Sequence, residues 1–313
     1  MGRCGGRTRS SPQRCDESVK LLFITSTRLG DAVLSTGLLG HLVAGKGVET
    51  TVVCGPVAAE LFECLPGLER VIVLDKEPRK GHWFGLWQQT VGTWWDLVVD
   101  LRASAVPFVL IRNKRRTKFR GGAGHRVESL ARWYGVEPVP SPRVWTSGTH
   151  HCHATRLVPC GGPVLGLAPT ASGRGKIWPW ENYVALARRL TSPDGALAGG
   201  RIVIMAAPAE HGLTQPIVEA LPRETTSDLT GSEHLLTLAE VMRRCTVVIA
   251  NDSGLMHLAA ASGAPTVGLF GPTPVETYAP WGNHAAVVTS TTGSMNDIAV
   301  DAVESTVGEL LER

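Results

Sequence analysis

A buried strand that runs into a helix through a short polar break is the feature of this chain that most constrains its fold. Residues 247–250 are apolar and partly β-branched; the polar residues 251–254 (Asn-Asp-Ser-Gly) follow, then an Ala- and Leu-rich run closed by Ser-Gly at 262–263. This pattern predicts a strand, a turn and a helix. A helix that opens at the end of a buried strand presents unpaired N–H groups and the positive end of its dipole. Such a turn can hold a phosphate or a diphosphate.

A second apolar strand is expected at residues 265–270, before Gly271, Pro272 and Thr273. Together with residues 247–263 it completes one β–α–β crossover. Open α/β sheets bind ligands beyond the carboxyl ends of their strands. We therefore expect residues 251–254 to line a polar pocket at that edge.

Alternating strands and helices extend this pattern over the rest of the chain. Apolar runs at 21–25, 50–54, 71–74 and 96–101 predict one parallel, doubly wound sheet, and runs at 164–168, 202–205 and 247–250 predict another. Helices are expected at 32–43, 58–65, 182–190, 215–220 and 301–311. The composition shifts to Pro, Ser, Thr, His and Gly between 138 and 162, which is typical of a linker. We expect a basic tail (1–19), an N-terminal domain (20–145), a linker (146–162) and a C-terminal domain (163–313).

The bulk composition excludes several classes of protein. The 313 residues are enough for two domains, and a net charge of +3 is too small to indicate nucleic-acid binding. No apolar run is long enough to span a membrane, and the arginine-bearing first nineteen residues lack the apolar core of a secretory signal. The seven cysteines form no C-x-x-C pair, as expected of thiols in a reducing compartment. These features predict a cytoplasmic protein.

Asp31 follows the first strand, where the first helix is expected to begin. A carboxylate there would face the space between the domains and could accept a proton from a substrate hydroxyl. The alternative is that Asp31 caps its helix, since Asp is a favoured N-cap residue. The sequence leaves both roles open.

The loop at residues 169–179 combines small residues with Arg174 and Lys176. Small residues let the backbone approach an anion, and the two cations bring positive charge to it. The loop is not a Walker A motif, because Thr170 and Ile177 occupy positions that need Gly and Ser or Thr. No G-x-G-x-x-G follows a strand either, which disfavours a nicotinamide dehydrogenase. A solvated basic loop is the alternative.

Within the polar break, the negative charge of Asp252 disfavours direct contact with a phosphate. Asp252 is expected to accept hydrogen bonds from sugar hydroxyls or to cap its own helix, while the N–H groups of Ser253 and Gly254 bind the phosphate.

Six of the nine residues at 112–120 are basic. They could dock an anionic acceptor or anionic lipid head groups. A solvated surface stretch is the simpler interpretation for most of these side chains.

The run His150-His151-Cys152-His153, with Cys160, resembles a metal cluster in composition only. Its spacing matches no structural zinc pattern, so we interpret these residues as incidental linker residues. The absence of any D-x-D pair argues against a metal-dependent nucleotide-sugar site.

Taken together, these motifs resemble glycosyltransferase family 9, the heptosyltransferases of lipopolysaccharide core synthesis. The resemblance covers about residues 21–309. It rests on the following segments: 28–36, 96–102, 125–128 with 134–135, 176–179, and, most specifically, 251–261 with 270–273.

The resemblance implies a GT-B architecture, in which two Rossmann-like domains face each other across a cleft. It further implies an inverting, metal-independent transferase that needs no cofactor and uses an ADP-heptose-type donor. Asp31 falls at the family's catalytic base and Lys176 at the position that holds the donor diphosphate. Ala171 departs from the family pattern, because well-studied members carry a hydroxyl there.

The resemblance and the motifs give two sets of binding residues. Expected donor contacts are Ser172, Arg174, Glu210 (near the ribose), Asn251, Asp252 (to the sugar), Ser253, Gly254 and His257. Expected acceptor contacts are Arg28, Gly30, Arg102 and Arg120. The acceptor would be a lipid-linked anionic saccharide, reached from the inner face of the cytoplasmic membrane. Two alternatives remain open: a nucleotide-sugar epimerase on the same scaffold, and a catalytically silent binding protein.

Overall fold

Each half of the chain builds its own parallel sheet, whose central strands are apolar and largely β-branched. The computed structural model describes residues 18–45, 47–75, 81–117, 119 and 121–313. The N-terminal sheet has the order β3-β2-β1-β4-β5 and the C-terminal sheet the order β11-β10-β9-β6-β7-β8, with all neighbours parallel. The strands are β1 (Val19–Ile24), β2 (Val48–Cys54), β3 (Leu68–Val73), β4 (Trp95–Asp100), β5 (Arg112–Arg116), β6 (Val164–Ala168), β7 (Arg201–Ile204), β8 (Thr226–Asp228), β9 (Val247–Asn251), β10 (Thr266–Phe270) and β11 (Ala285–Thr289).

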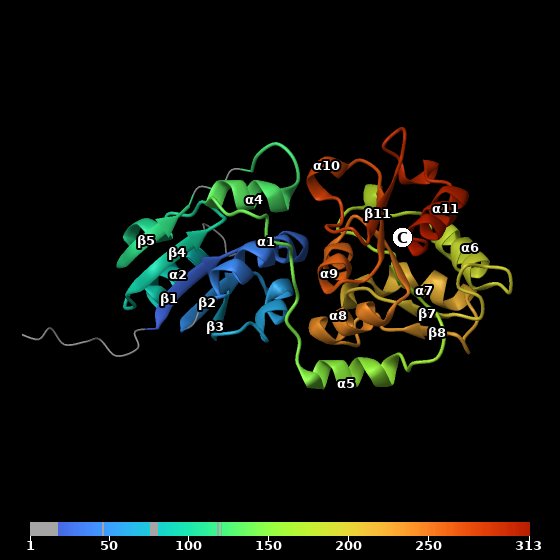
Figure 1. Ribbon diagram of the computed structural model, residues 1–313, viewed down its shortest axis with the longest axis horizontal. Coiled ribbons are helices and arrows are strands. Elements are labelled where there is room, and N and C mark those ends of the chain that lie inside the picture. Colours follow the sequence, from blue (N-terminus) through green and yellow to red (C-terminus); the bar gives the residue numbers. More distant parts are fainter. Residues whose placement is uncertain (1–17, 46, 76–80, 118, 120) are drawn as a thin grey trace, which may run out of the picture.

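Helices connect the strands and cover both sheets (Figure 1). The α-helices are α1 (Leu29–Leu42), α2 (Gly81–Thr90), α3 (Val106–Val109), α4 (Arg126–Tyr134), α5 (Gly148–Leu157), α6 (Trp180–Thr191), α7 (His211–Ala220), α8 (Leu235–Arg244), α9 (Gly254–Ser262), α10 (Val275–Tyr278) and α11 (Val300–Leu311). Short 3₁₀ turns are η1 (Pro56–Ala58), η2 (Glu60–Phe62), η4 (Arg174–Lys176), η5 (Pro208–Glu210) and η6 (Met295–Asp297).

Strand order places a topological switch point in each half. The first strand of the N-half, β1, lies between β2 and β4, and the first strand of the C-half, β6, lies between β7 and β9. Chain connections leave in opposite directions at such a point, which opens a crevice beyond the carboxyl ends of the two strands. The turns after β1 and β9 therefore lie where this fold binds ligands. The predicted pair of Rossmann-like halves is confirmed, as is the crossover β9-α9-β10.

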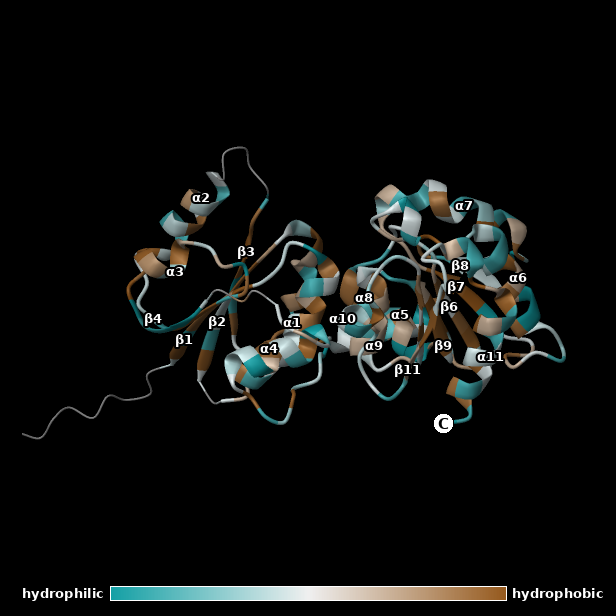
Figure 2. Cartoon of the chain, turned by 90° about the horizontal axis from the view of Figure 1, so that it is seen from above, coloured by the Kyte–Doolittle hydropathy of each residue, from teal (hydrophilic) through white to brown (hydrophobic). Residues whose placement is uncertain are grey.

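The two halves meet through the helices that follow these turns. In Figure 1, α1 and α9 lie side by side between the halves, and the two helices pack directly together. One buried apolar cluster runs through this contact, from Leu21 and Phe23 in the N-half to Leu258 and Ala259 in the C-half. Apolar strands likewise fill the interior of the C-half (Figure 2).

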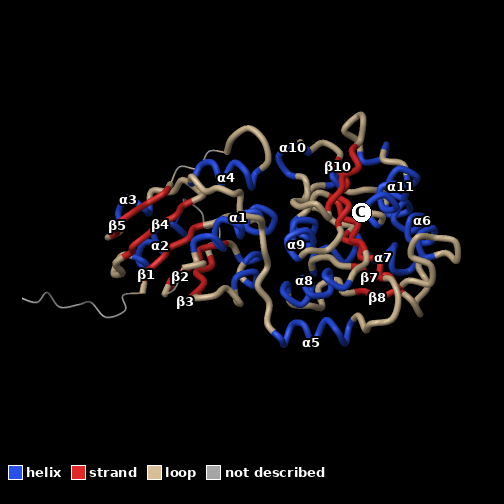
Figure 3. The backbone as a smooth tube through the Cα atoms, in the orientation of Figure 1, coloured by secondary structure: helices blue, strands red, loops and turns tan. Residues whose placement is uncertain are grey.

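A second connection between the halves lies at the segment after α4. The chain crosses to the C-half as an extended loop and then forms α5 along its lower edge (Figure 3). Ser147 and His150 form a capping box at the start of α5: the His150 ring nitrogen Nδ1 accepts the Ser147 backbone N–H (3.2 Å) and lies 2.8 Å from the Ser147 hydroxyl. Residues 148–157, which the composition assigned to a linker, are therefore helical.

Several other local predictions differ from the structure. Helix α1 begins at Leu29 rather than Ala32, so Arg28 is its N-cap and the capping role considered for Asp31 is wrong. The helix expected at 58–65 is a pair of 3₁₀ turns. The basic run, for which no element was predicted, includes an edge strand: residues 112–116 form β5, and most of its side chains are exposed. Elements β8, α8 and β11 lie where no element was predicted.

Two further observations concern the cysteines and the helices. Five cysteines of the described segments are free thiols; burial raises the pKa of both Cys54 and Cys245 to about 12, which keeps these two protonated. None of the helices in the described segments is both long and apolar enough to cross a membrane.

Candidate functional site

The turn after β9 is held rigidly by Asn251. Its side-chain oxygen accepts hydrogen bonds from the Trp178 backbone N–H (3.2 Å) and the Tyr183 hydroxyl (3.0 Å), and its side-chain nitrogen donates to the Pro169 carbonyl (2.7 Å). Asn251 is fully buried. The side-chain amide thus connects the turn to the loop after β6. Asn251 was expected to contact the donor, but in the structure it holds the backbone of the site in place.

Lys176 and Asp252 form an ion pair at the same edge of the sheet. Lys176 Nζ lies 2.6 Å from Asp252 Oδ2. The Asp252 side chain is 8% exposed, whereas Lys176 keeps a third of its surface open to solvent. The carboxylate fixes the direction of the ammonium group, and the exposed part of the ammonium remains able to contact an anion.

Helix α9 begins immediately beyond this ion pair. Ser253 is its N-cap, but its hydroxyl makes no capping hydrogen bond; the oxygen is buried and unpartnered among the described residues. The first N–H groups of any α-helix also lack intrahelical partners. The ammonium group of Lys176 thus lies beside the N-terminus of α9, which is an arrangement that can bind a phosphate or a diphosphate.

The loop after β6 and the turn after β7 are linked through Glu210. One oxygen of Glu210 accepts hydrogen bonds from the Thr170 hydroxyl (2.7 Å) and the Ala207 backbone N–H (3.0 Å). Thr170, which sequence reasoning did not select, is buried and helps to hold this corner. Ser172 and Arg174 lie further along the same loop with exposed side chains.

On the N-half, Asp31 lies in the first turn of α1. Its carboxylate is 23% exposed, and its partners are distant: Ser26 Oγ at 3.5 Å and Arg126 Nε at 3.8 Å. Arg126, at the start of α4, is a residue that sequence reasoning missed as part of the site. Its guanidinium stacks on Phe119, with 4.4 Å to the ring centroid, and so holds a positive charge beside Asp31.

Two glycines bring the turn of Asp31 and the turn of Asp252 into contact. A Cβ atom on Gly254 would lie 2.8 Å from Leu29 Cβ, and one on Gly30 would lie 2.8 Å from the His257 ring. A Cβ at either position would force the two helices apart. Asp31 and the Lys176–Asp252 pair therefore flank the contact between the halves.

His257 lies inside this contact. Burial lowers its pKa to about 4; the charge of Asp252 acts in the opposite direction, and those of His125 and Lys176 add to the lowering. Its Nδ1 atom is buried and finds no partner in the described part of the chain. A neutral imidazole thus separates the two turns.

His125 joins the halves on another side of the same region. Its Nδ1 accepts the Val127 N–H that it caps (3.2 Å), so Nε2 carries the proton and donates to the Ala279 carbonyl (2.9 Å). Its ring also packs on Trp281, with centroids 4.7 Å apart. Burial lowers the pKa of His125, which favours this neutral form.

The expected acceptor residues lie at the carboxyl edge of the N-terminal sheet where they are described. Arg28 is exposed at the N-cap of α1. Arg102 follows β4, and its guanidinium lies 5.1 Å from the centroid of a ring of Trp83. The buried Asp100 shapes this loop by accepting hydrogen bonds from the backbone of Arg102 (2.8 Å) and Ser104 (2.7 Å). Arg120 lies outside the described residues.

The histidines of α5 do not converge on a metal site. His150 stacks on His234, with centroids 5.1 Å apart, whereas His151 pairs with Glu240 (3.1 Å) and His153 with Glu233 (3.5 Å). No group of three or more metal-ligating side chains occurs within the segments that the structure describes.

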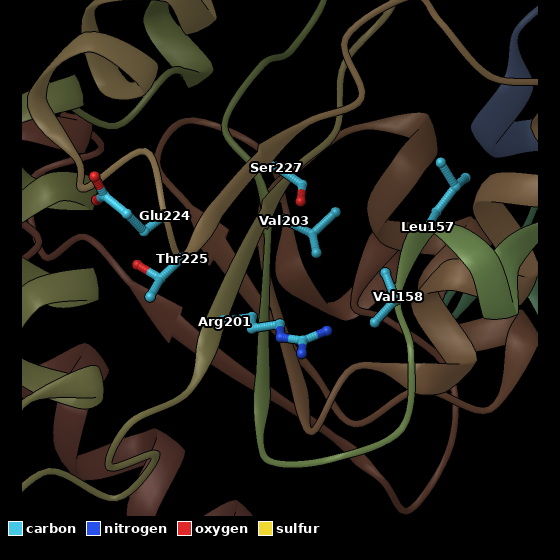
Figure 4. Close-up of a pocket in the computed structure, with 7 residues that line it drawn as sticks. All are labelled: Leu157, Val158, Arg201, Val203, Glu224, Thr225 and Ser227. Carbon is cyan, nitrogen blue, oxygen red and sulfur yellow. The ribbon is translucent and has the colours of Figure 1, made fainter.

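A hollow of about 190 Å³ in the C-half is distinct from the candidate site (Figure 4). It lies near the amino ends of β7 and β8, at the opposite edge of the sheet from Asp252 and Lys176. Its lining residues are Leu157, Val158, Arg201, Val203, Glu224, Thr225 and Ser227.

Comparison with solved structures gives the same architecture. The ADP-heptose lipopolysaccharide heptosyltransferase II of Escherichia coli superposes with a TM-score of 0.75 and 22% identity, over 94% of this chain and 99% of that one. A glycosyl transferase family 9 protein from Veillonella parvula gives 0.78 and 21% identity, over 96% and 99%.

Sequence comparison gives the family. The profile described as "Glycosyltransferase family 9 (heptosyltransferase)" matches residues 137–306. Lipopolysaccharide heptosyltransferase 2 of Salmonella typhimurium is 32% identical over 88% of this chain and 89% of its own. Lipooligosaccharide heptosyltransferase 2 of Haemophilus influenzae is 33% identical, but over only 40% of this chain and 36% of its own. The match therefore spans about a third of one curated relative and most of the other. The chain belongs to glycosyltransferase family 9 and is a glycosyltransferase.

Proposed function

We propose that this enzyme transfers a heptose-type sugar from an ADP-sugar donor to a saccharide acceptor of the lipopolysaccharide core type, with inversion and without a metal. The observation that carries the proposal is the Lys176–Asp252 pair at the N-terminus of α9, across the contact between the halves from Asp31. The donor and acceptor classes are those named for its relatives from Salmonella typhimurium and Escherichia coli.

The C-half supplies what the leaving group requires. When the bond between the anomeric carbon and the diphosphate breaks, negative charge develops on the diphosphate. Lys176, Arg174 and the α9 N-terminus can meet that charge, and donors fixed before the reaction stabilise it most effectively. Asp252 keeps the ammonium in place, and we assign its carboxylate to the sugar hydroxyls.

The N-half supplies the base. The acceptor hydroxyl attacks the anomeric carbon from the side opposite the diphosphate, and its proton passes to Asp31. The long contacts to Ser26 and Arg126 leave the Asp31 carboxylate free to accept that proton. Attack from the opposite face inverts the configuration at the anomeric carbon.

This division of labour assigns the acceptor to residues 20–145 and the donor to residues 163–313. We include Arg28, Gly30 and Arg102 among the acceptor contacts, and Ser172, Ser253, Gly254 and Glu210 among the donor contacts. An acceptor of this class is lipid-linked and anionic, so the enzyme would work in the cytoplasm at the inner face of the cytoplasmic membrane.

The test is the release of ADP from ADP-heptose, measured with and without a heptose-accepting truncated core saccharide. Release that depends on the acceptor, with a product of inverted anomeric configuration by NMR, is the expected result. Activity that survives a chelator such as EDTA is expected as well.

Two outcomes would contradict the proposal. Isomerisation of the ADP-sugar without an acceptor would indicate an epimerase, and binding of ADP-heptose without turnover would indicate a silent binding protein. Binding is measured separately, as the rise in melting temperature at a fixed nucleotide-sugar concentration.

A further inference from the structure

Exposed apolar side chains gather at the end of the N-half that faces away from the C-half. Eleven large apolar residues of the described chain are exposed, and five of them fall between residues 84 and 111. Figure 2 shows α3 as an apolar element at this outer end. These five residues are Phe84 (61% exposed), Trp94 (59%), Phe108 (42%), Val109 (58%) and Ile111 (53%).

Contacts between the elements place these residues in one region at the outer end of the N-half. Helices α2 and α3 pack together. The Trp95 backbone N–H donates to the Ile111 carbonyl (3.0 Å), which sets Trp94 beside Ile111. Phe108 lies under the Arg115 guanidinium, at 4.2 Å from its ring centroid.

Strand β5 adds positive charge to this surface. Arg112, Lys114, Arg115 and Arg116 lie on the strand, which is the outermost of its sheet (Figure 1). Residues 81–117 contain only two acidic side chains, and both are turned to internal partners. Asp96 accepts the Lys20 backbone N–H (2.9 Å), and Asp100 is fully buried.

Protection of a sheet edge is one explanation for the charges, but only for the charges. Natural proteins often place Lys and Arg on edge strands to prevent pairing with other chains. That explanation does not account for Trp, Phe, Ile and Val exposed beside those charges, because an apolar surface next to an open edge promotes association. The combination needs a partner that is both apolar and anionic.

We propose that this surface, formed by Phe84, Trp94, Phe108, Val109, Ile111 and residues 112–115, docks on a bilayer that contains anionic phospholipid. Trp and Phe side chains suit the boundary between head groups and acyl chains, and the cations pair with lipid phosphates. A soluble anionic saccharide would use the cations but gives no reason for the exposed apolar side chains. The inference extends the proposed use of a lipid-linked acceptor, which would lie in the same membrane.

The experiment is co-sedimentation of the full-length enzyme with vesicles, in the absence of any sugar. One set contains equal parts phosphatidylglycerol and phosphatidylcholine, and the other contains phosphatidylcholine alone. We expect binding to the anionic vesicles that weakens as salt rises. Trp94→Ser/Lys114→Gln should lower the partition coefficient by about tenfold or more, since one cation near such a surface contributes about fivefold.

The matched control is Leu213→Ser/Arg223→Gln, which removes one exposed apolar side chain and one exposed cation from the C-half. It should bind vesicles like the wild type. The inference fails if the wild type does not bind anionic vesicles, or if the two double variants bind them to the same extent as each other. It also fails if the Trp94/Lys114 variant binds vesicles normally but raises KM for a soluble core saccharide, because the surface would then be an acceptor site.

Because the assay contains no substrate, its result is independent of the proposed reaction. With a soluble acceptor, both variants should retain the wild-type kcat. Failure of the transferase assay with normal vesicle binding would contradict only the proposed function, and the reverse pattern would contradict only this inference.

Discussion

The turn after β1 and the turn after β9 each lie beside the switch point of their own half but hold their charged side chains very differently. Asp31 has partners at 3.5 and 3.8 Å, whereas Asp252 and Lys176 are joined at 2.6 Å next to Asn251, whose side chain is held by three hydrogen bonds. A group that must exchange a proton needs a free acceptor oxygen, and a group that must meet a developing charge needs a fixed position. The contrast in local order therefore matches the two roles proposed for the turns.

Replacing Asp31 gives the largest effect expected from this contrast. Asp31→Asn keeps the shape but removes the base, so kcat should fall by about 100- to 10,000-fold. The melting temperature should barely change, because the lost contacts are long. The measurement is ADP release at saturating donor and acceptor.

Asp194→Asn is the matched control, since Asp194 is an exposed acid in a loop of the C-half, and it should retain full activity. If Asp31→Asn kept the wild-type kcat, Asp31 would not be the catalytic base, and the proposed mechanism would be contradicted.

The same contrast explains how much the sequence could predict. The crossover at 247–270 was predictable because buried apolar runs, a polar break and a closing glycine all act locally. The rigidity of its turn was not, since Asn251 is fixed by partners up to 82 residues away. The contacts of Arg126 with Asp31 and of Thr170 with Glu210 could not be predicted for the same reason, because the partners are far apart along the chain.

Local signals were also insufficient at two elements. Four basic residues at 112–116 carry no apolar alternation, so nothing in them indicates the edge strand that β4 stabilises by pairing. The segment 148–157 has a weak helical composition, and its helix depends on the capping box of Ser147 and His150 and on packing against α8. Both β5 and α5 therefore form because of contacts with residues distant in the sequence.

Removing the ammonium group tests the rigid turn. Lys176→Met should lower kcat by about 100- to 1,000-fold, the loss typical of a fixed donor to a developing negative charge. It should also cost about 2 kcal/mol in the free energy of unfolding, because Asp252 is left buried without its counter-ion. Urea unfolding and ADP release measure the two effects.

A double variant separates stability from catalysis. Lys176→Met/Asp252→Asn removes the unpaired charge, so stability should return toward the wild type while activity stays low. Lys20→Met is the control for losing a lysine: its pairing with Glu49 is 3.9 Å long and exposed, so neither quantity should change appreciably. Recovery of activity in the double variant would contradict the role of Lys176.

The effect expected to be smallest at neutral pH concerns the contact between the two turns. Burial holds the pKa of His257 at about 4, whereas an unfolded histidine titrates near 6.5. Between these values the unfolded chain binds a proton that the folded chain does not, so falling pH favours unfolding. This one group should cost up to ~3 kcal/mol as pH drops from about 6.5 to about 4, with no further loss below that.

His257→Gln should remove that part of the pH dependence, because glutamine is neutral in both states, while the exposed His41→Gln should leave the wild-type curve unchanged. The measurement is the free energy of urea unfolding at several pH values from 7 down to about 4. Equal curves for wild type and His257→Gln would mean that water reaches the imidazole in solution. In solution, helices α1 and α9 would then be separated. The turn of Asp31 and the turn of Asp252 would come into contact only when a donor or an acceptor binds between the halves.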